Sequence, residues 1–180
     1  MRLKKARLHN FRGILEQEVQ FHPYSLLVGP NNAGKSTVID GIRAFYEKDG
    51  FKYKPANDFT FLITEDDESW IELGFELTEG EHESLADAYK VADRSLRVRK
   101  YFQTKTKSAD GKTATGSIFG YKSDGTLSDE PFYGAKNVQS GKFGELIYIP
   151  AVSQVDEHTK LSGPSALRDL LTDVMSDVVE

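Results

Sequence analysis

Apolar and polar positions alternate through the first part of the chain, and this pattern predicts strands. Ala6 and Leu8 each lie between polar or charged neighbours, which is typical of a strand with one buried face. The chain then turns at Pro23, and residues 25–28 form a short apolar run that ends at a glycine. Such a run is typical of a strand buried on both sides. We therefore expect paired strands followed by one buried strand of a parallel sheet.

A helix is predicted directly after this buried strand. Val38, Ile42 and Phe45 recur at helical spacing, and residues 48–50 supply a polar end that closes with a glycine. Residues 29–34 are therefore predicted to be the loop that joins the strand to the helix.

The middle of the chain has the pattern of an antiparallel flank. Alternation over residues 71–77 predicts a strand with one solvent-facing side, residues 81–93 predict a short helix, and residues 96–102 return to strand. Two Asp-Gly pairs supply the positive φ angles that hairpin turns need, so residues 96–146 are predicted to be a β-meander.

The last part of the chain predicts one more strand and one more helix. Residues 146–149 are apolar and end at Pro150, and leucines and valines recur at helical spacing over residues 164–180. Neither glycine nor proline closes this helix. We therefore expect the helix to continue into a part that the sequence lacks.

Composition and charge fit one globular domain and exclude several classes. The chain has 180 residues with a formal net charge of −5, which excludes a domain coated in positive charge. It has no cysteine, hence no disulfide framework and no thiolate site, and its four histidines lack the spacing of a helical metal pair. The N-terminus lacks the apolar stretch of a signal peptide and no window resembles a membrane span. A cytoplasmic location is the expectation.

The strongest chemical signal is a phosphate-binding loop between the predicted buried strand and the helix. GPNNAGKS matches G-x-x-x-x-G-K-[ST] at every fixed position, and the predicted strand and helix give it the required context. The alternative is a glycine turn that happens to precede a helix. Backbone N–H groups of such a loop surround phosphates, and the helix N-terminus adds its positive dipole. The expected nucleotide-binding residues are Gly29, Pro30, Asn31, Asn32, Ala33, Gly34, Lys35, Ser36 and Thr37.

Three side chains of the loop have separate expected roles. Lys35 supplies a positive charge to the β- and γ-phosphates, and Ser36 offers its hydroxyl to Mg²⁺. Thr37 adds a hydrogen bond to the α-phosphate. The predicted ligands are therefore ATP and Mg²⁺.

The residues around the loop resemble a known group of ATPases. The stretch LHNFR, the strand that follows it and LLVGPNNAGKSTVIDGI together resemble the N-terminal half of ABC-type ATPases of the RecF and structural-maintenance-of-chromosomes (SMC) group. Within that group, the Asn-Asn form of the loop and LIYIPAVSQVDEHTKLSGPSALRDLL resemble the overcoming-lysogenization-defect (OLD) family of ATP-dependent nucleases. The first resemblance covers residues 1–46 and the second rests on residues 146–171.

This resemblance implies a fold class and a domain plan. The fold is an α/β, ABC-type P-loop lobe with a parallel core sheet and an antiparallel β flank, and it is incomplete. Residues 1–180 form the N-terminal portion of one ATPase domain. Strands, phosphate loop and first helix occupy residues 1–50, the antiparallel flank residues 68–150, and a loop and helix residues 150–180.

The resemblance also implies further site residues. Asn10 and Arg12 would lie near the nucleotide, with Arg12 against phosphate or base; the alternative for Arg12 is an exposed arginine at a strand end. Gln154 stands where a glutamine of the group holds Mg²⁺ or the attacking water, although a surface role is the alternative. The signature loop and the Asp-Glu strand of such ATPases are not found. Ser162 of Leu161-Ser162-Gly163 fits a helix cap better than a signature loop. We expect this chain alone to bind nucleotide weakly and hardly to hydrolyse it.

A basic segment is the candidate contact for DNA. Residues 94–112 hold seven Lys and Arg against one Asp, with aromatic residues among them. Arg97, Arg99 and Lys100 are the candidates for sequence-independent phosphate contacts, and a solvated sheet face is the alternative. The four acids of residues 65–68 and Trp70 are interpreted as a solvated turn and a core-edge residue.

The sequence leaves three functions open. The first is the ATP-binding part of an OLD-like, ATP-gated DNA endonuclease in DNA maintenance or phage defence, which pairs its ATPase heads as a homo-oligomer on double-stranded DNA. The second is a DNA-repair ATPase of the RecF/SMC type without nuclease activity. The third is a stand-alone nucleotide-binding module. No membrane partner is expected.

Overall fold

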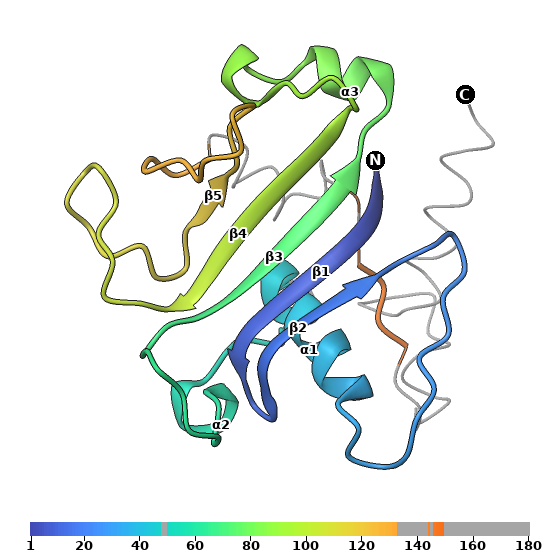
Figure 1. The fold of residues 1–180 in the computed structure, drawn as a ribbon, viewed down its shortest axis with the longest axis vertical. Helices are drawn as coiled ribbons and strands as arrows, with labels where there is room; N and C mark the ends of the chain where they lie inside the picture. The colour runs from blue at the N-terminus through green and yellow to red at the C-terminus, as the bar shows by residue number, and fades with distance from the viewer. Residues whose placement is uncertain (48–49, 133–143, 145, 150–180) are drawn as a thin grey trace, which may run out of the picture. The chain divides into compact units, whose positions relative to one another are not determined.

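A five-stranded sheet and one long helix form the fold of the N-terminal unit (Figure 1). The computed structural model describes residues 1–47, 50–132, 144 and 146–149. The chain divides into two compact units, Met1–Gly144 and Glu145–Glu180, and the elements named below belong to the first. Its strands are β1 Arg2–Phe11, β2 Ile14–Gln20, β3 Ser69–Glu76, β4 Ser95–Gln103 and β5 Ile118–Gly120.

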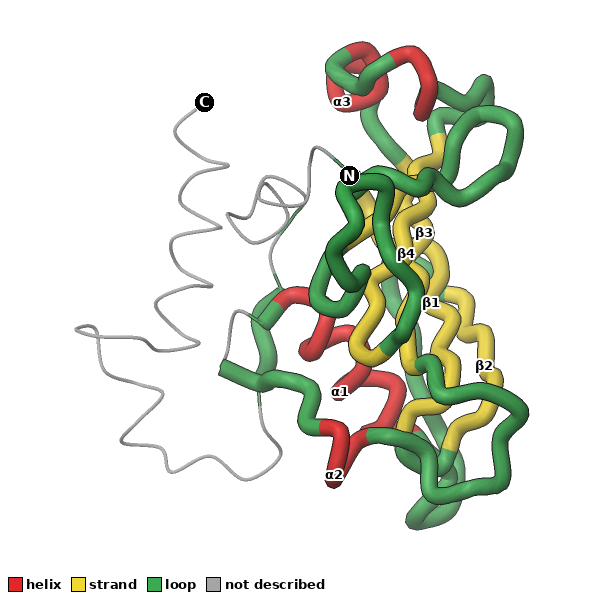
Figure 2. The backbone as a smooth tube through the Cα atoms, turned by 90° about the vertical axis from the view of Figure 1, so that its left-hand side faces the viewer, coloured by secondary structure: helices red, strands yellow, loops and turns green. Residues whose placement is uncertain are grey.

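The sheet has the order β2-β1-β3-β4-β5, and every described strand pair is antiparallel. β1 pairs with β2 through a hairpin. The long connection from β2 to β3 carries α1 Lys35–Tyr46 and α2 Pro55–Asp58, and β3 then pairs with the other edge of β1. Between β3 and β4 lie α3 Glu79–Glu83 and the 3₁₀ turn η1 Asp87–Tyr89. Figure 2 shows α1 and α2 on one side of the sheet.

The main core lies between α1 and the sheet. Leu8 of β1 and Ile71 of β3 are fully buried and face Gly41 of α1. A Cβ added to Gly41 would overlap the Leu8 side chain, so the glycine lets the helix approach the sheet closely. Val38, Ile42 and Phe45 of α1 are buried, as the helical spacing predicted.

The opposite face of the sheet is partly covered as well. Trp70 of β3 and Tyr101 of β4 pack with Ala114, Phe119 and Leu127 into a second apolar cluster. β3 is therefore buried on both faces over most of its length, although its sequence predicted one solvent-facing side. The long segment that follows β4 supplies the cover.

The α/β class and the antiparallel flank are confirmed, but the expected parallel core sheet is not found among the described strands, and the predicted strand over residues 25–28 is wrong. These residues form a loop in which Leu26 and Val28 are exposed. A strand buried on both sides needs neighbours in its sheet and layers above and below it. No described strand pairs with this segment, and all four described strand pairings are antiparallel.

Three smaller expectations also need correction. Residues 146–149 are described without strand structure, although their apolar pattern predicts a strand. The helix expected over residues 81–93 is broken into α3 and η1, because Ala86 is extended and Leu85 turns into the core. The meander expected over residues 96–146 contains β4, the short β5 and isolated bridges within the described residues. Among the helices described here, none is long and apolar enough to cross a membrane.

Candidate functional site

The loop before α1 has a geometry that presents backbone N–H groups. Gly34 precedes the first helical residue with φ 84°, and Asn32 also has a positive φ of 65°. Glycine adopts this conformation without the steric cost that a Cβ brings. In the described part of the chain, the N–H groups of Lys35, Ser36 and Thr37 donate to no backbone or side-chain acceptor. Three unused donors at a helix N-terminus form a cradle for an anion.

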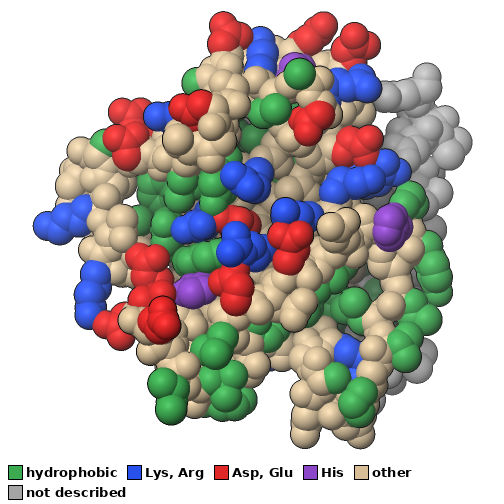
Figure 3. Space-filling view, viewed as in Figure 1, with side chains coloured by type: hydrophobic (Ala, Val, Ile, Leu, Met, Phe, Trp, Pro, Cys, Tyr) green, Lys and Arg blue, Asp and Glu red, His purple; other side chains and the backbone are tan. Residues whose placement is uncertain are grey.

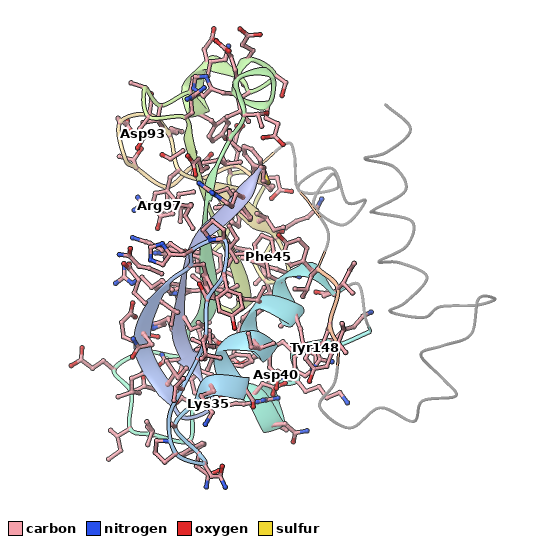
Figure 4. All side chains as sticks on the ribbon, turned by 90° about the vertical axis from the view of Figure 1, so that its right-hand side faces the viewer. Lys35, Asp40, Phe45, Asp93, Arg97 and Tyr148 are labelled. Carbon is pink, nitrogen blue, oxygen red and sulfur yellow. The ribbon has the colours of Figure 1, made fainter. Side chains whose placement is uncertain are left out.

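The Lys35 side chain folds over this loop. Its ammonium donates to the carbonyl oxygens of Gly29 at 2.8 Å and Pro30 at 2.7 Å. Figure 4 shows Lys35 at the beginning of α1 and Asp40 further along the same helix. The hydroxyls of Ser36 and Thr37 have no hydrogen-bond partner within the described residues, so both are available to a ligand.

A cleft of about 1270 Å³ opens beside the loop. One wall is the β1–β2 turn with β2, and another is the phosphate loop with the first turn of α1. Apolar side chains complete the lining and are exposed to solvent, in contrast to those of the core: Leu15, Leu26, Val28, Phe61 and Leu62. Ligand sites of proteins commonly enclose about 300–1,000 Å³, so the cleft is large enough for a nucleotide.

Arg12 lines this cleft and is held by two carboxylates. Its Nη1 lies 2.6 Å from Asp40 of α1, and its Nε lies 2.8 Å from Asp58 of α2. Burial disfavours the charge, but the hydrogen bonds and charges of Asp40 and Asp58 outweigh it and raise the pKa of Arg12. The residue therefore joins the β1–β2 turn to both helices. Its contact with a nucleotide stays a prediction.

Asn10 is fully buried and does not line the cleft. Its Nδ2 donates to Asp66 Oδ1 at 3.0 Å and to the Glu68 carbonyl at 2.9 Å, and its Oδ1 accepts from Thr64 Oγ1 at 2.8 Å. The backbone has φ 46°, a conformation that asparagine tolerates better than most residues. This geometry gives Asn10 a positioning role for residues 60–68, and the predicted nucleotide contact remains untested.

The three candidate DNA contacts do not form one surface. Lys100 is 1% exposed and lies on the α1 side of the sheet, where its Nζ donates to the carbonyls of Ala44 and Phe45 and to Glu47. It closes the C-terminus of α1 and is not accessible to a nucleic acid, which corrects that part of the expectation. Strand alternation explains the separation, because residues 97 and 99 point to the other face.

Arg99 is also engaged inside the protein. It pairs with Glu72 and lies 3.9 Å from the centre of the Trp70 ring. Arg97 lies 3.6 Å from the centre of the Tyr121 ring and pairs with no carboxylate in the described ranges. Figure 4 shows Arg97 on the side of the sheet away from α1. Of the three candidates, Arg97 is the one left for an external anion.

The positive charge of residues 94–112 is partly balanced, for three of its seven cations by acids of other segments. Glu47, Asp67 and Glu72 neutralise Lys100, Lys105 and Arg99, and Asp110 lies 3.3 Å from Lys112. Figure 3 shows Lys and Arg interleaved with Asp and Glu over the middle of the face of the molecule that it draws. The local excess of charge in the sequence is therefore not an equal excess on the surface.

Three of the four acids of residues 65–68, and Trp70, make contacts within the protein. Asp66 accepts from Asn10, Asp67 pairs with Lys105, and Glu68 accepts from Thr104. No group of three or more potential metal ligands occurs among the residues that the structure describes. Trp70 is buried at the edge of the core and stacks on the His9 ring, with the two ring centres 4.8 Å apart. Gln154 and the Leu161–Gly163 candidate lie outside the described residues.

Three residues of the site were not predicted from the sequence. Asp40 and Asp58 pair with Arg12, and Phe61 lines the cleft. The two aspartates are far apart in the sequence and belong to no motif, so only the fold brings them together. Phe61 belongs to the run FTFLIT, and the exposed apolar residues of that run are the signal that could have revealed it.

The sheet, the helix and the glycine-rich loop at its N-terminus define a nucleotide-binding protein of the P-loop type. The sequence profile of the AAA ATPase domain family matches residues 1–139, and the chain belongs to this family.

The chain is also similar to one curated protein and to two solved structures. It is 28% identical over 188 residues to the Old nuclease of Escherichia phage P2, covering 99% of this chain and 30% of that protein. The chain thus spans less than a third of that relative. A structure from a study of ATP-driven dimerization and DNA-stimulated activation of SMC ATPases aligns with a TM-score of 0.51 and 13% identity, over 96% of this chain and 98% of that one.

The SMC head domain from Thermotoga maritima aligns with a TM-score of 0.43 and 22% identity, over 78% of this chain and 41% of that one. The fold is therefore that of SMC-type ATPase heads, an inference that rests on the alignment with the higher TM-score. The family match confirms the predicted ATPase class, and the similarity to the Old nuclease and the fold of SMC-type heads are consistent with the predicted OLD, RecF and SMC group.

Proposed function

We propose that the chain is the ATP-binding lobe of an ATP-gated DNA endonuclease of the OLD family, acting in DNA maintenance or phage defence. The observation that carries the proposal is the loop before α1, with its unused N–H donors, its lysine and its free hydroxyls. The identity to the Old nuclease over almost the whole chain supports the link to DNA cleavage.

The loop explains how a triphosphate would be held. Phosphate oxygens accept from the unused N–H groups, while the ammonium of Lys35 exchanges two neutral carbonyl partners for charged oxygens. Ser36 lies in the first turn of α1 with a free hydroxyl, and this fits a Mg²⁺ ion shared between a hydroxyl and phosphates. Magnesium would neutralise charge on the β- and γ-phosphates. The chain's own residues bind and orient the nucleotide.

The remaining parts of an ATPase site are not among the described residues. An ABC-type site also needs an acidic pair at a strand end and a signature loop from a second head. We therefore expect residues 1–180 alone to bind ATP weakly and to hydrolyse it slowly. Pairing of two heads around ATP would supply the missing groups.

A cleavage assay tests the nuclease proposal. Supercoiled plasmid is incubated with the full-length protein and Mg²⁺, with and without ATP, and the same reactions are run with Lys35→Ala. The proposal expects nicked or linear DNA whose yield depends on ATP in the wild type and loses that dependence in Lys35→Ala. Intact plasmid under all conditions would contradict it.

The second candidate function is a DNA-clamping ATPase of the RecF/SMC type without nuclease activity. The alignment with an SMC ATPase structure favours it. In the same assay, this function predicts uncut plasmid that is retained on the protein only when ATP is present.

We further propose that Arg97 is a phosphate contact for double-stranded DNA in either case. It is the candidate cation that no described carboxylate neutralises. In the full-length protein, Arg97→Glu should weaken DNA binding at low salt more than Lys105→Glu, because Lys105 already pairs with Asp67. Equal affinities of the two variants would leave Arg97 with a structural role only.

A further inference from the structure

The segment that carries Phe61 is fixed to the β1–β2 turn. The Thr60 N–H donates to the Asn10 carbonyl at 3.2 Å, and the Phe61 N–H donates to the Arg12 carbonyl at 3.4 Å. Phe59 forms an isolated antiparallel bridge with Phe11 just before it. The backbone at Phe61 is thus held like the end of a strand, and the direction of its side chain follows from this pairing.

Phe61 is nevertheless 79% exposed. Its ring lies against the backbone of the turn, since a Cβ added to Gly13 would come within 3.3 Å of Phe61 Cζ. One side of the ring therefore rests on the turn while most of its surface faces solvent. Large aromatic side chains gain free energy from burial, so a ring fixed in this position has surface available for a ligand.

The same ring lines the cleft that contains the phosphate loop. Lys35 and Thr37 lie on one wall of this cleft, and Phe61 and Leu62 on another. A nucleotide whose phosphates occupy the loop must extend its ribose and base along the cleft. The wall offered by Phe61, Leu62 and Leu15 carries no side-chain hydrogen-bonding group, which suits the flat face of a base.

We propose that the Phe61 ring is the platform on which the base of the bound nucleoside triphosphate stacks. This inference rests on the proposed function of the phosphate loop and adds the residue that recognises the other end of the ligand. Stacking on an aromatic ring is open to every base, because every base has a π-face. The platform therefore contributes affinity for the nucleoside and little selection between adenine and guanine.

Binding measurements with and without a base test this inference. The full chain is titrated by calorimetry with ATP, with GTP and with inorganic tripolyphosphate, each with Mg²⁺. Phe61→Ala should weaken ATP and GTP by a similar factor of about 5- to 150-fold, the range expected for one stacked base. It should leave the affinity for tripolyphosphate within about twofold, because this ligand has no base to lose.

Ile63→Ala is the matched control. Ile63 belongs to the same loop, is 98% exposed and does not line the cleft, so its truncation should leave all three affinities unchanged. Phe61→Tyr retains the ring and should restore nucleotide binding. Thermal unfolding of each variant checks folding, which the exposure of both side chains should preserve.

The outcomes separate the two proposals. Unchanged ATP affinity in Phe61→Ala overturns the platform and leaves the phosphate site standing. Equal losses for ATP and tripolyphosphate, or losses shared by Ile63→Ala, also overturn it, since they report a change in the loop as a whole. A wild-type chain that binds neither ATP nor tripolyphosphate overturns the proposed function itself.

Discussion

Replacing Asn10 separates a role in folding from a role in nucleotide binding. Asn10 is fully buried, and its amide makes three hydrogen bonds to the segment between α2 and β3. Asn10→Ala removes all three hydrogen bonds. It also leaves at φ 46° a residue that, unlike asparagine, has no polar side chain to stabilise this backbone angle. We expect the free energy of unfolding to fall.

The magnitude follows from these contacts. Two neutral hydrogen bonds contribute about 0.5–1.5 kcal/mol each and the bond to the Asp66 carboxylate contributes slightly more, while the left-handed backbone adds about 1 kcal/mol for alanine. With about 1.5–3 kcal/mol for the bond to the carboxylate, these contributions sum to an expected loss of about 3.5–7 kcal/mol. Asn10→Gly loses the same hydrogen bonds but tolerates the backbone angle, so it should be about 1 kcal/mol more stable than Asn10→Ala.

Urea unfolding followed by circular dichroism measures both variants against the wild type. Binding of tripolyphosphate with Mg²⁺, measured well below the unfolding transition, should be unchanged, because Asn10 does not line the cleft. A loss of stability below about 1 kcal/mol together with weaker ATP binding would be incompatible with a purely structural Asn10. It would assign Asn10 to the nucleotide instead.

Two further predictions concern buried ionisable groups. Burial raises the pKa of Tyr46 to about 12 from its ordinary value of 10, so its stabilising contribution is complete below pH 10 and is lost as the pH rises to 12. Tyr46→Phe should reduce the fall in unfolding free energy over pH 10–12 by up to about 1.4 kcal/mol per pH unit, and an unchanged slope in urea titrations would disprove this. Lys100→Ala leaves the carbonyls of Ala44 and Phe45 and the Glu47 carboxylate without their buried donor, and it should cost about 2–4 kcal/mol in the same assay. Wild-type stability of Lys100→Ala would show that the C-terminus of α1 does not depend on this lysine.

Local patterns in the sequence predicted the elements that local chemistry determines. The alternation around Ala6 and Leu8 and the helical spacing of Val38, Ile42 and Phe45 were enough to predict β1 and the buried face of α1. The phosphate loop was predictable because its glycines and lysine stand at fixed spacings beside a helix start.

Features that depend on distant parts of the chain could not be predicted in this way. Residues 25–28 have the apolar pattern of a buried strand, but pairing depends on neighbours that a local pattern does not reveal. In the sequence, Lys100 is one member of a basic run. It is buried against the C-terminus of α1 only because the fold places that helix on the same side of the sheet. Arg12 meets Asp40 and Asp58 only after α1 and α2 have packed near the β1–β2 turn.

The proposed function depends above all on the loop before α1 binding the phosphates of a nucleoside triphosphate. Calorimetric titration of ATP with Mg²⁺ into the wild type, Lys35→Ala and Lys105→Ala measures this binding. Lys105 is exposed and pairs only with Asp67 in the described structure, so it controls for the loss of one positive charge. We expect saturable binding to the wild type and Lys105→Ala and at least about tenfold weaker binding to Lys35→Ala. Equal ATP affinities in the wild type and Lys35→Ala would contradict a phosphate site in this loop.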